Sequence, residues 1–442
     1  MAEGETPDIA PDPHAVAALR RRGRRHMLEI LAGIAAFAVL IALPPPGGMG
    51  EAAWRVVAVT ALMAVWWVSE AVPAAITALV PIALFPLLGV RPVGEVTAPY
   101  ANPLVFLLFG GFLLGLAMEH CALHRRIALA ILRAAGRRPE ALVGGFMAAT
   151  AFLSMWISNT ATTAMMLPIG LSVVALIGTR EAGAPLALPE SGPERNLAVA
   201  LLLGIAYAAN IGGMATLIGT PPNALLAGYM EETHGIRIGF AQWMLVGVPA
   251  ALLMLGLAWL LLTRLIHPVA GSDMAGLRSL LGRETVRMGP VTRAEWRVAA
   301  ICIAAALGWL LRPLLEALLP GLALSDAGIA MLAGLALFVV PADMARDRFL
   351  LDWTTARAAP WNVVLLVGGG LSLGGAIDSS GLSAWIGEAL SGLGAAPLVV
   401  AVAALAGAAM LVSHITSNTA TAAARVPIVA GLAATVGEAP LQ

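Results

Sequence analysis

The long apolar segments of this chain constrain its fold more than any other feature, because only a lipid bilayer accommodates so many of them. A helix that crosses the hydrocarbon core needs about 20 mostly apolar residues. Only 12% of the 442 residues are charged, against about 25% in a typical soluble domain. We therefore predict an all-α polytopic membrane protein. Its apolar segments lie near residues 27–46, 53–72, 73–90, 103–123, 196–229, 242–266, 296–319, 323–341 and 361–390.

Two further apolar stretches, about 140–178 and 397–434, are each interrupted by a polar Ser-Asn-Thr cluster. A lipid-exposed helix does not tolerate such a break, because non-helical backbone at membrane depth occurs only where protein or a water-filled cavity surrounds it. We therefore expect two re-entrant helical hairpins, each entering and leaving the membrane on one side.

The distribution of arginine predicts the orientation. The polar tail 1–26 ends in an arginine cluster and precedes an apolar run without a convincing cleavage site, so we expect a retained first span and a cytoplasmic N-terminus. Threading the spans from there places the arginine-rich loops inside, and the loops 43–52 and 378–396, which contain no arginine, outside. The pattern indicates a multi-pass protein of the inner membrane. The zero formal net charge offers no basis for binding nucleic acid.

The chain also repeats itself at a constant offset of 259 residues. An odd number of spans separates the two copies, so the second copy would enter the membrane upside down. Inverted repeats with broken helices at mid-membrane are the architecture of secondary transporters, which is the function class that the repeat predicts. The matches are Gly110, Gly111 and Gly115 with Gly369, Gly370 and Gly374, Glu119 with Asp378, Leu123 with Leu382, Ser154 with Ser413, the Ser-Asn-Thr-Ala-Thr run 158–162 with 417–421, and Pro168 and Ile169 with Pro427 and Ile428.

The Ser-Asn-Thr loops supply two hydroxyls and one amide, each able to donate and to accept hydrogen bonds. The helix that follows adds free N–H groups and the positive end of its dipole. Together they can hold a carboxylate without a fixed cation, and their oxygens can also face a hard cation such as sodium. The alternative is that Ser, Asn and Thr merely cap a helix, which two symmetry-related copies in a membrane make the weaker interpretation.

A second element is the run Gly219-Thr220-Pro221-Pro222-Asn223. Proline removes a backbone donor and its predecessor leaves the helical region, so we predict that the span 196–229 is discontinuous here. The freed carbonyls could bind a cation, while Thr220 could face the substrate. The alternative is a simple proline kink.

Other sequence features give weaker evidence of function. Gly370-Leu371-Ser372-Leu373-Gly374 has the pattern of a nucleophile elbow, but its glycines belong to the repeat and no strand is expected before it. Without a paired Ser and His or a metal cluster, we do not expect an enzyme. Glu70 is either a functional intramembrane acid or an interfacial residue, and His414 either titrates or packs as a neutral imidazole. The two cysteines lie far apart and predict neither a disulfide nor a zinc site.

These motifs resemble the divalent anion/sodium symporter family, the INDY-type transporters, over roughly residues 50–434. The resemblance implies a homodimer in which a scaffold holds a transport domain that moves as an elevator. It implies dicarboxylate substrates such as succinate, malate and fumarate, with citrate or sulfate in some branches, and sodium as the coupling ion. The motifs are Trp66 to Pro73, Gly110 to Glu119, His124 to Leu129, both Ser-Asn-Thr-Ala-Thr loops, and Gly219 to Asn223.

The resemblance also implies roles for single residues. Those expected to contact the substrate are Ser158, Asn159, Thr160, Thr220, Pro221, Ser417, Asn418 and Thr419. One sodium ion is expected at Ser154, Ser158, Asn159 and Gly219, and a second at Ser413, Thr416 and Asn418.

The expected organisation has five segments. They are a cytoplasmic tail 1–26, scaffold helices 27–95, a first transport half 96–240, further scaffold helices with a cytoplasmic loop 241–345, and a second transport half 346–442. The repeat offset places the second copy of the Gly-Thr-Pro-Pro-Asn break near position 478, beyond Gln442, so we expect the C-terminal helices of the second half to be missing and residues 1–442 alone to take up little succinate. The sequence leaves open a sodium-independent dicarboxylate exchanger and a citrate or sulfate transporter of the same family. A channel-forming subunit or an inorganic-anion pump fits the paired loops less well.

Overall fold

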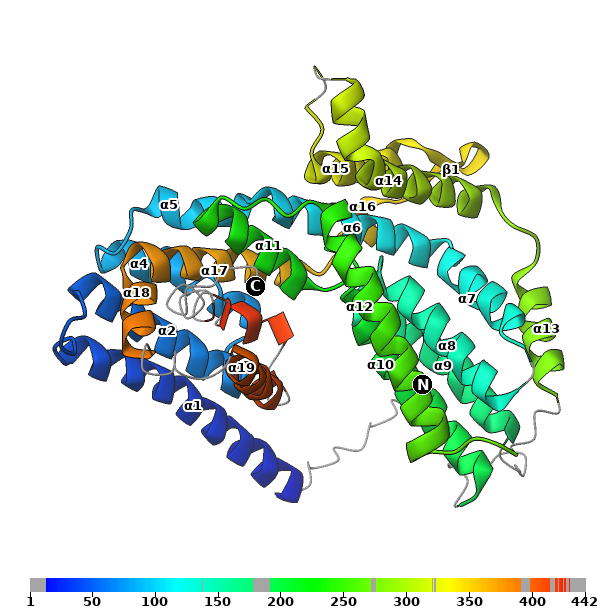
Figure 1. The fold of residues 1–442 in the computed structure, drawn as a ribbon, viewed down its shortest axis with the longest axis horizontal. Coiled ribbons are helices and arrows are strands. Elements are labelled where there is room, and N and C mark those ends of the chain that lie inside the picture. The colour runs from blue at the N-terminus through cyan, green and yellow to red at the C-terminus, as the bar shows by residue number, and fades with distance from the viewer. Residues whose placement is uncertain are drawn as a thin grey trace, which may run out of the picture. The chain divides into compact units, whose positions relative to one another are not determined.

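The structure is a computed structural model, and its helices divide into two compact units, one of residues 1–100 and 368–442 and the other of residues 101–367. Each unit is described by itself (Figure 1). The residues that the structure describes are 13–136, 138–177, 191–271, 276–319, 321, 323–390, 398–413, 418, 419, 421–423, 425, 426 and 429.

The first unit is built on an antiparallel pair of long helices. Trp54 and Trp66 of α2 donate their indole N–H groups to the carbonyls of Leu40 (2.8 Å) and Ile30 (3.2 Å) on α1. Pro73 begins the next helical turn, so the expected segment 73–90 forms two short helices in place of one span. The helices of this unit are α1 (Pro13–Ala42), α2 (Glu51–Ser69), α3 (Ala74–Thr77), α4 (Val80–Leu87), α5 (Val93–Thr97), α18 (Leu382–Leu390), α19 (Leu398–Ser413), and most of the 3₁₀ turn η1 (Ala98–Ala101).

Helix α17 (Trp361–Ser379) begins in the second unit and ends in the first. Gly381, with a φ of +79°, separates it from α18, so the expected segment 361–390 consists of two helices. A left-handed residue of this kind ends a helix at little steric cost only when it is glycine.

The second unit holds the first Ser-Asn-Thr loop. Its elements are α6 (Pro103–His120), α7 (Leu123–Ala134), α8 (Pro139–Ser154), α9 (Asn159–Ile177), α10 (Pro193–Gly213), α11 (Pro221–His234), α12 (Phe240–Leu260) with the π-helical turn η2 (Leu261–Ile266), α13 (Leu277–Met288), α14 (Arg293–Leu318), α15 (Asp326–Val339), β1 (Pro341–Asp343), the 3₁₀ turn η3 (Met344–Arg346), β2 (Arg348–Phe349) and α16 (Trp353–Ala356). The antiparallel pair β1–β2 is the one sheet within the described residues.

Glycines allow the closest helix approaches in this unit. A Cβ on Gly110 of α6 would lie 2.7 Å from the backbone of Ala330 on α15, and one on Gly212 of α10 would overlap the backbone of Ala151 on α8. Backbones come this near only where no side chain separates them. The α8–α10 and α6–α15 pairs therefore form the packed centre of the unit, and α8 and α10 carry the two elements of the candidate site.

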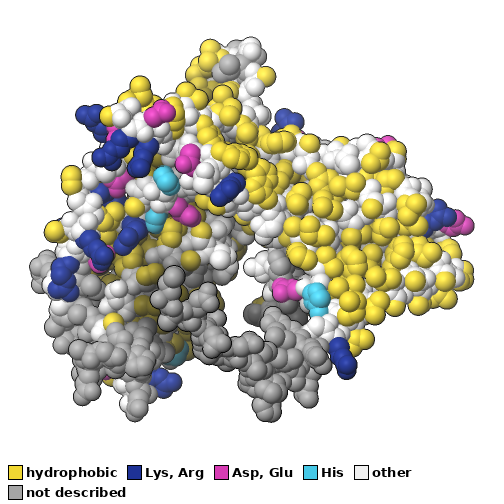
Figure 2. Space-filling model, turned by 180° about the vertical axis from the view of Figure 1, so that it is seen from behind, with side chains coloured by type: hydrophobic (Ala, Val, Ile, Leu, Met, Phe, Trp, Pro, Cys, Tyr) yellow, Lys and Arg dark blue, Asp and Glu magenta, His cyan; other side chains and the backbone are white. Residues whose placement is uncertain are grey.

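Seven helices in the described residues are long and apolar enough to cross a membrane. Large apolar side chains on them are exposed, including Leu245 (76%) and Leu253 (66%) of α12, and Figure 2 shows hydrophobic side chains covering much of the face in view. A soluble protein would bury such surface, so the prediction of an all-α polytopic membrane protein is confirmed. The seven are Gly23–Ala42, Glu51–Ser69, Val93–His120, Pro193–Gly213, Phe240–Ile266, Arg293–Leu318 and Trp361–Ser379.

The helix bounds follow the 259-residue offset. Helix α6 ends at His120 where α17 ends at Ser379, and α7 begins at Leu123 where α18 begins at Leu382. Two helix boundaries therefore recur at the same offset as the sequence motifs. The inverted orientation of the two repeat copies and the five-segment organisation stay predictions.

Candidate functional site

The first Ser-Asn-Thr loop lies at the tip of a helical hairpin. Helix α8 ends at Ser154 and α9 begins at Asn159. The hydroxyl of Ser158 accepts a hydrogen bond from the backbone N–H of Ala161 at 3.3 Å, so Ser158 caps α9, as the simpler interpretation proposed. Thr160, the third residue of the loop, is exposed and leaves its hydroxyl available. The hairpin was predicted correctly, while its re-entry into a membrane stays a prediction.

The second element, the predicted break in the span 196–229, is also present. Helix α10 ends at Gly213 and α11 begins at Pro221. Thr220 is extended, with φ −144° and ψ 138°, as expected of a residue before proline. The seven residues between the two helices therefore have no regular helical hydrogen bonding, and their polar backbone groups need other partners.

Side chains on both sides of the break supply those partners. The amide of Asn223 donates to the carbonyls of Gly213 (3.0 Å) and Thr216 (2.8 Å). The hydroxyl of Thr216 donates to the carbonyl of Met155 (2.5 Å) and accepts from the N–H of Gly219 (3.1 Å). We expected freed carbonyls to bind a cation, but two of them are already satisfied by Asn223. The carbonyl oxygen of Gly219 lies 3.3 Å from the amide of Asn159 in the loop.

The loop and the break meet at Asn159. Ser154, one turn before the loop, donates its hydroxyl to the carbonyl of Ala209 on α10 (2.7 Å), and its Oγ lies 2.8 Å from Asn159 Oδ1. A Cβ on Gly219 would lie 2.9 Å from the Ser154 carbonyl oxygen, and one on Gly213 would overlap Asn159 Oδ1. The structure thus brings together Ser154, Asn159 and Gly219.

Three oxygens surround the amide of Asn159: Ser154 Oγ and the carbonyl oxygens of Ala209 and Gly219. The amide is best satisfied when its nitrogen faces them, with hydrogen bonds of 2.8, 3.1 and 3.3 Å. The opposite orientation would turn its oxygen toward these three oxygens and place its nitrogen 3.2 Å from Asn210 Oδ1. Oxygens repel one another unless a proton or a cation lies between them. This position therefore suits a hard monovalent cation, which prefers oxygen ligands and is held in transporters by carbonyls of unwound helices.

Ser158 and Glu119 line a pocket of about 180 Å³ beside the loop. The other lining residues are Phe112, Gly115, Leu116, Ile157, Ala161, Ala358 and Pro360. The repeat matches Glu119 with Asp378, but nothing in its local sequence marks it as a neighbour of the loop. The pocket thus offers the hydroxyl of Ser158 and the carboxyl group of Glu119 beside the loop.

The glycines of α6 hold both elements close. A Cβ on Gly111 would lie 3.2 Å from the side chain of Ile218, the residue before Gly219, and one on Gly115 would lie 3.6 Å from the carbonyl oxygen of Trp156. These repeat glycines therefore let the break and the hairpin tip rest directly on α6.

The second Ser-Asn-Thr loop belongs to the other unit. Ser417 and Thr416, and with them His414, lie outside the described residues. Ser413 ends α19 and donates its hydroxyl to the carbonyl of Met410 at 2.9 Å. Asn418 is exposed and helical, and Thr419 is buried. The roles expected of these residues stay predictions.

Two other residues of interest have clear positions. Ser372, in the elbow-like pattern, is buried and donates to the carbonyl of Val96 at 2.9 Å, so it is not presented as a nucleophile. Glu70 is exposed in the left-handed region, with a φ of 53°, directly after α2.

Comparison with known proteins assigns most of the chain, including both copies of the repeat, to one family. Residues 24–442 match the family described as the sodium:sulfate symporter transmembrane region. The chain is similar to the sodium-dependent dicarboxylate transporter SdcS of Staphylococcus saprophyticus, with 36% identity over 420 residues, 94% of this chain and 80% of the relative. The SdcS proteins of two Staphylococcus aureus strains, USA300 and RF122, are 37% and 38% identical over 392 residues, 87% of this chain and 74% of each relative.

Proposed function

Because this chain belongs to the sodium:sulfate symporter family, we propose that it is a secondary transporter that carries C4-dicarboxylates such as succinate, malate and fumarate together with sodium. The observation that carries the proposal is the oxygen cluster around Asn159, where the loop and the broken helix meet. This cluster consists of Ser154 Oγ and the carbonyl oxygens of Ala209 and Gly219. The names of the SdcS relatives support both the dicarboxylate and the sodium dependence.

Sodium binding would turn the amide of Asn159 from its favoured orientation to the opposite one. Ser154 has a single hydroxyl proton, and it is 2.7 Å from the Ala209 carbonyl. With that proton committed, the amide nitrogen of Asn159 is the favourable neighbour when no cation is present. A sodium ion would reverse the preference and draw the amide oxygen inward, beside Ser154 Oγ and the Gly219 carbonyl. Ser158 would contribute by capping α9 at the end of the loop.

Substrate binding would follow from the same geometry. The N-terminus of α9 carries the positive end of a helix dipole, and the exposed Thr160 and half-buried Asn159 offer uncharged donors. Thr220 and Pro221 border the break. A bound sodium ion would add the positive charge that these groups lack, so that a dicarboxylate binds well only with sodium present. The family resemblance assigns Ser417, Asn418 and Thr419 to substrate binding as well.

The wider features of the proposal are the inverted repeat, an elevator movement of the transport halves, a homodimer in the inner membrane and a cytoplasmic N-terminus. The helix bounds that recur at the 259-residue offset support the repeat. The arginine-rich loops support the orientation. Sulfate, which the family description names, is the second candidate substrate.

The proposal is tested by uptake of radiolabelled succinate into membrane vesicles from cells that express the protein. We expect uptake that requires sodium and is lost when choline replaces it. Uptake that continues in choline and depends on internal dicarboxylate would establish an exchanger instead. Unlabelled fumarate should compete strongly, and citrate and sulfate weakly; strong competition by sulfate alone would overturn the choice of substrate.

A matched pair of variants separates the site from general damage. Asn159→Ala should abolish sodium-dependent uptake. Asn196→Ala removes an amide that donates to the carbonyl of Pro268 at the other end of α10, and it should leave uptake within twofold of wild type.

A further inference from the structure

We propose that an apolar pocket behind the first Ser-Asn-Thr loop binds one acyl chain of a membrane lipid. The pocket has a volume of about 640 Å³, within the range of about 300–1,000 Å³ typical of small-ligand sites. It lies between α6, α7, α8 and α14. Its lining residues are Leu114, Met118, Leu123, Ile127, Ala130, Ile131, Phe152, Trp156, Ile218, Ala299, Cys302, Ile303, Ala306, Leu307 and Trp309.

The chemistry of the lining selects an apolar occupant. Among these side chains the polar atoms are a thiol, at Cys302, and indole nitrogens, and Trp309 already donates its N–H to the Asp326 carbonyl at 2.9 Å. A stable water needs two to four polar partners, which this lining does not provide. A charged dicarboxylate would lose its hydration without compensation. Hydrocarbon is therefore the fitting occupant.

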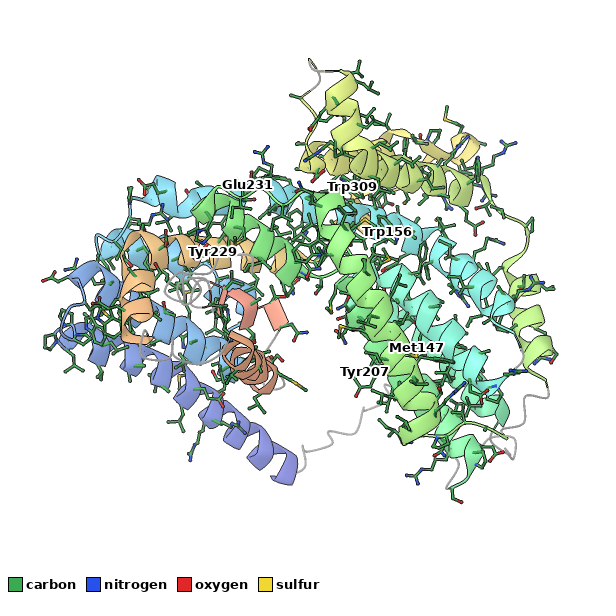
Figure 3. All side chains as sticks on the ribbon, viewed as in Figure 1. Met147, Trp156, Tyr207, Tyr229, Glu231 and Trp309 are labelled. Atoms are coloured by element: carbon green, nitrogen blue, oxygen red, sulfur yellow. The ribbon has the colours of Figure 1, made fainter. Side chains whose placement is uncertain are left out.

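The length of the pocket matches one lipid leaflet. Its lining on α14 runs from Ala299 to Trp309, which at 1.5 Å per residue is about 15 Å. That is half of the roughly 30 Å hydrocarbon core. The lining includes the stacked rings of Trp156 and Trp309, 6.4 Å apart between centroids and labelled in Figure 3.

A cationic side chain, that of Arg133, lies on α7 close to the residues of this helix that line the pocket. Arg133 follows Ala130 by three residues, so the two share a face of α7. Arg133 is exposed, and no ion pair or hydrogen bond of its side chain is present within the described residues. An anionic phosphate at this end and an acyl chain along α14 would use both features of the pocket, which favours a phospholipid over an uncharged hydrocarbon ligand.

The pocket and the candidate site share a wall, because residues beside the loop and the break also line the pocket. Ile218 precedes Gly219, and Trp156 lies two residues before Ser158. Both residues line the pocket, and the Ile218 side chain and the Trp156 carbonyl oxygen lie near the α6 glycines. An acyl chain would therefore press the break and the hairpin tip against α6, and its removal would loosen the Asn159 oxygen cluster.

The direct test uses phosphatidylglycerol with a diazirine in its acyl chain, mixed into phosphatidylethanolamine vesicles that contain the full protein. Photolabelling of Cys302 and Ala306 should saturate as the mole fraction of the probe rises, whereas labelling of the exposed Leu314 should rise linearly, as for bulk lipid. Labelling that rises linearly at all three positions, or that spares Cys302 and Ala306, would overturn the proposal.

A pocket-filling variant gives a second test. Ala306→Trp should lower labelling of Cys302 at least fivefold, while Ala304→Trp, an exposed position of α14 outside the lining, should change it less than twofold. Equal labelling in both variants, or a bismaleimide crosslink from Cys302 to a second copy in place of lipid labelling, would contradict an acyl-chain site. These labelling results do not depend on the proposed transport function.

Discussion

The side-chain amide of Asn223 donates to the carbonyl oxygen of Gly213 at 3.0 Å and so bridges the break between α10 and α11. The same amide donates to Thr216, and Asn223 is only 8% exposed. Two buried carbonyls thus depend on one side chain, because α11 opens with two prolines that lack N–H groups.

Replacing Asn223 with leucine should destabilise the protein. A buried carbonyl that loses its donor costs about 1–3 kcal/mol, and here two lose it together. We expect a lower midpoint of thermal unfolding in detergent and loss of sodium-dependent uptake. Asn196→Leu, at the exposed start of α10, is the control; an equal loss of stability in both variants would show that the bridge is unimportant.

Gly213→Ala should weaken sodium binding more than it affects folding. Alanine favours a helix over glycine by about 1 kcal/mol, but its Cβ would overlap Asn159 Oδ1. We expect the sodium concentration for half-maximal effect to rise about tenfold, which corresponds to about 1.4 kcal/mol.

Gly256→Ala is the matched control for this substitution, since a Cβ at Gly256 of α12 meets nothing within 4 Å. It should keep wild-type sodium dependence and equal or higher stability. Unchanged sodium dependence in Gly213→Ala would place Asn159 outside the sodium site.

Arg126 and Glu295 form a two-pronged ion pair between α7 and α14, with contacts of 2.8 and 3.2 Å. The Glu295 side chain is 3% exposed. Arg126→Ala would leave this carboxylate buried and unpaired, a loss of about 3–5 kcal/mol. Arg125→Ala breaks a longer, half-exposed pair with Glu284 (3.5 Å) and should cost about 0–1 kcal/mol. Urea unfolding of both variants measures the difference, and equal losses would contradict a special role for the Arg126 pair.

His124 predicts a dependence of stability on pH. Burial lowers the pKa of His124 below its usual value of about 6.5, the nearby Arg125 lowers the pKa further, and the hydrogen bond to the Met118 carbonyl opposes both. Below pH 6.5 the unfolded chain therefore takes up a proton more readily than the folded chain. The free energy of unfolding should fall as the pH drops from about 6.5 toward the lowered pKa.

The variant His124→Gln should lack this part of the pH dependence. The unfolding midpoints of both proteins, measured between pH 7.5 and 5, should converge or cross as the pH falls. His26→Gln, at an exposed position of α1, should behave as wild type. Parallel curves for wild type and His124→Gln would show that His124 does not contribute.

The sequence predicted the elements of the candidate site better than their connections. Apolar length and the Pro221-Pro222 pair located both the hairpin and the break, because these signals are local. The meeting of Ser154, Asn159 and Gly219 followed from the family resemblance, since nothing local shows that α8 and α10 pack together.

Other contacts had no sequence signal. Asn223 resembles an ordinary turn residue after proline, and Arg126 and Glu295 are 169 positions apart. Their roles arise from tertiary packing that brings distant groups into buried contact. The apolar pocket was hidden for the same reason, because its residues are indistinguishable in sequence from those that face bulk lipid.

Sodium binding to the purified protein tests the central claim, that the first Ser-Asn-Thr loop and the broken helix form a sodium site. The measurement is the thermal unfolding of wild type and Asn159→Ala in increasing sodium chloride, with choline chloride holding the ionic strength constant. A ligand at 100 times its Kd stabilises the folded state by about 2.7 kcal/mol. We predict a saturable rise in the unfolding midpoint of wild type and none in Asn159→Ala. An equal rise in both proteins, or none in wild type, would contradict the account.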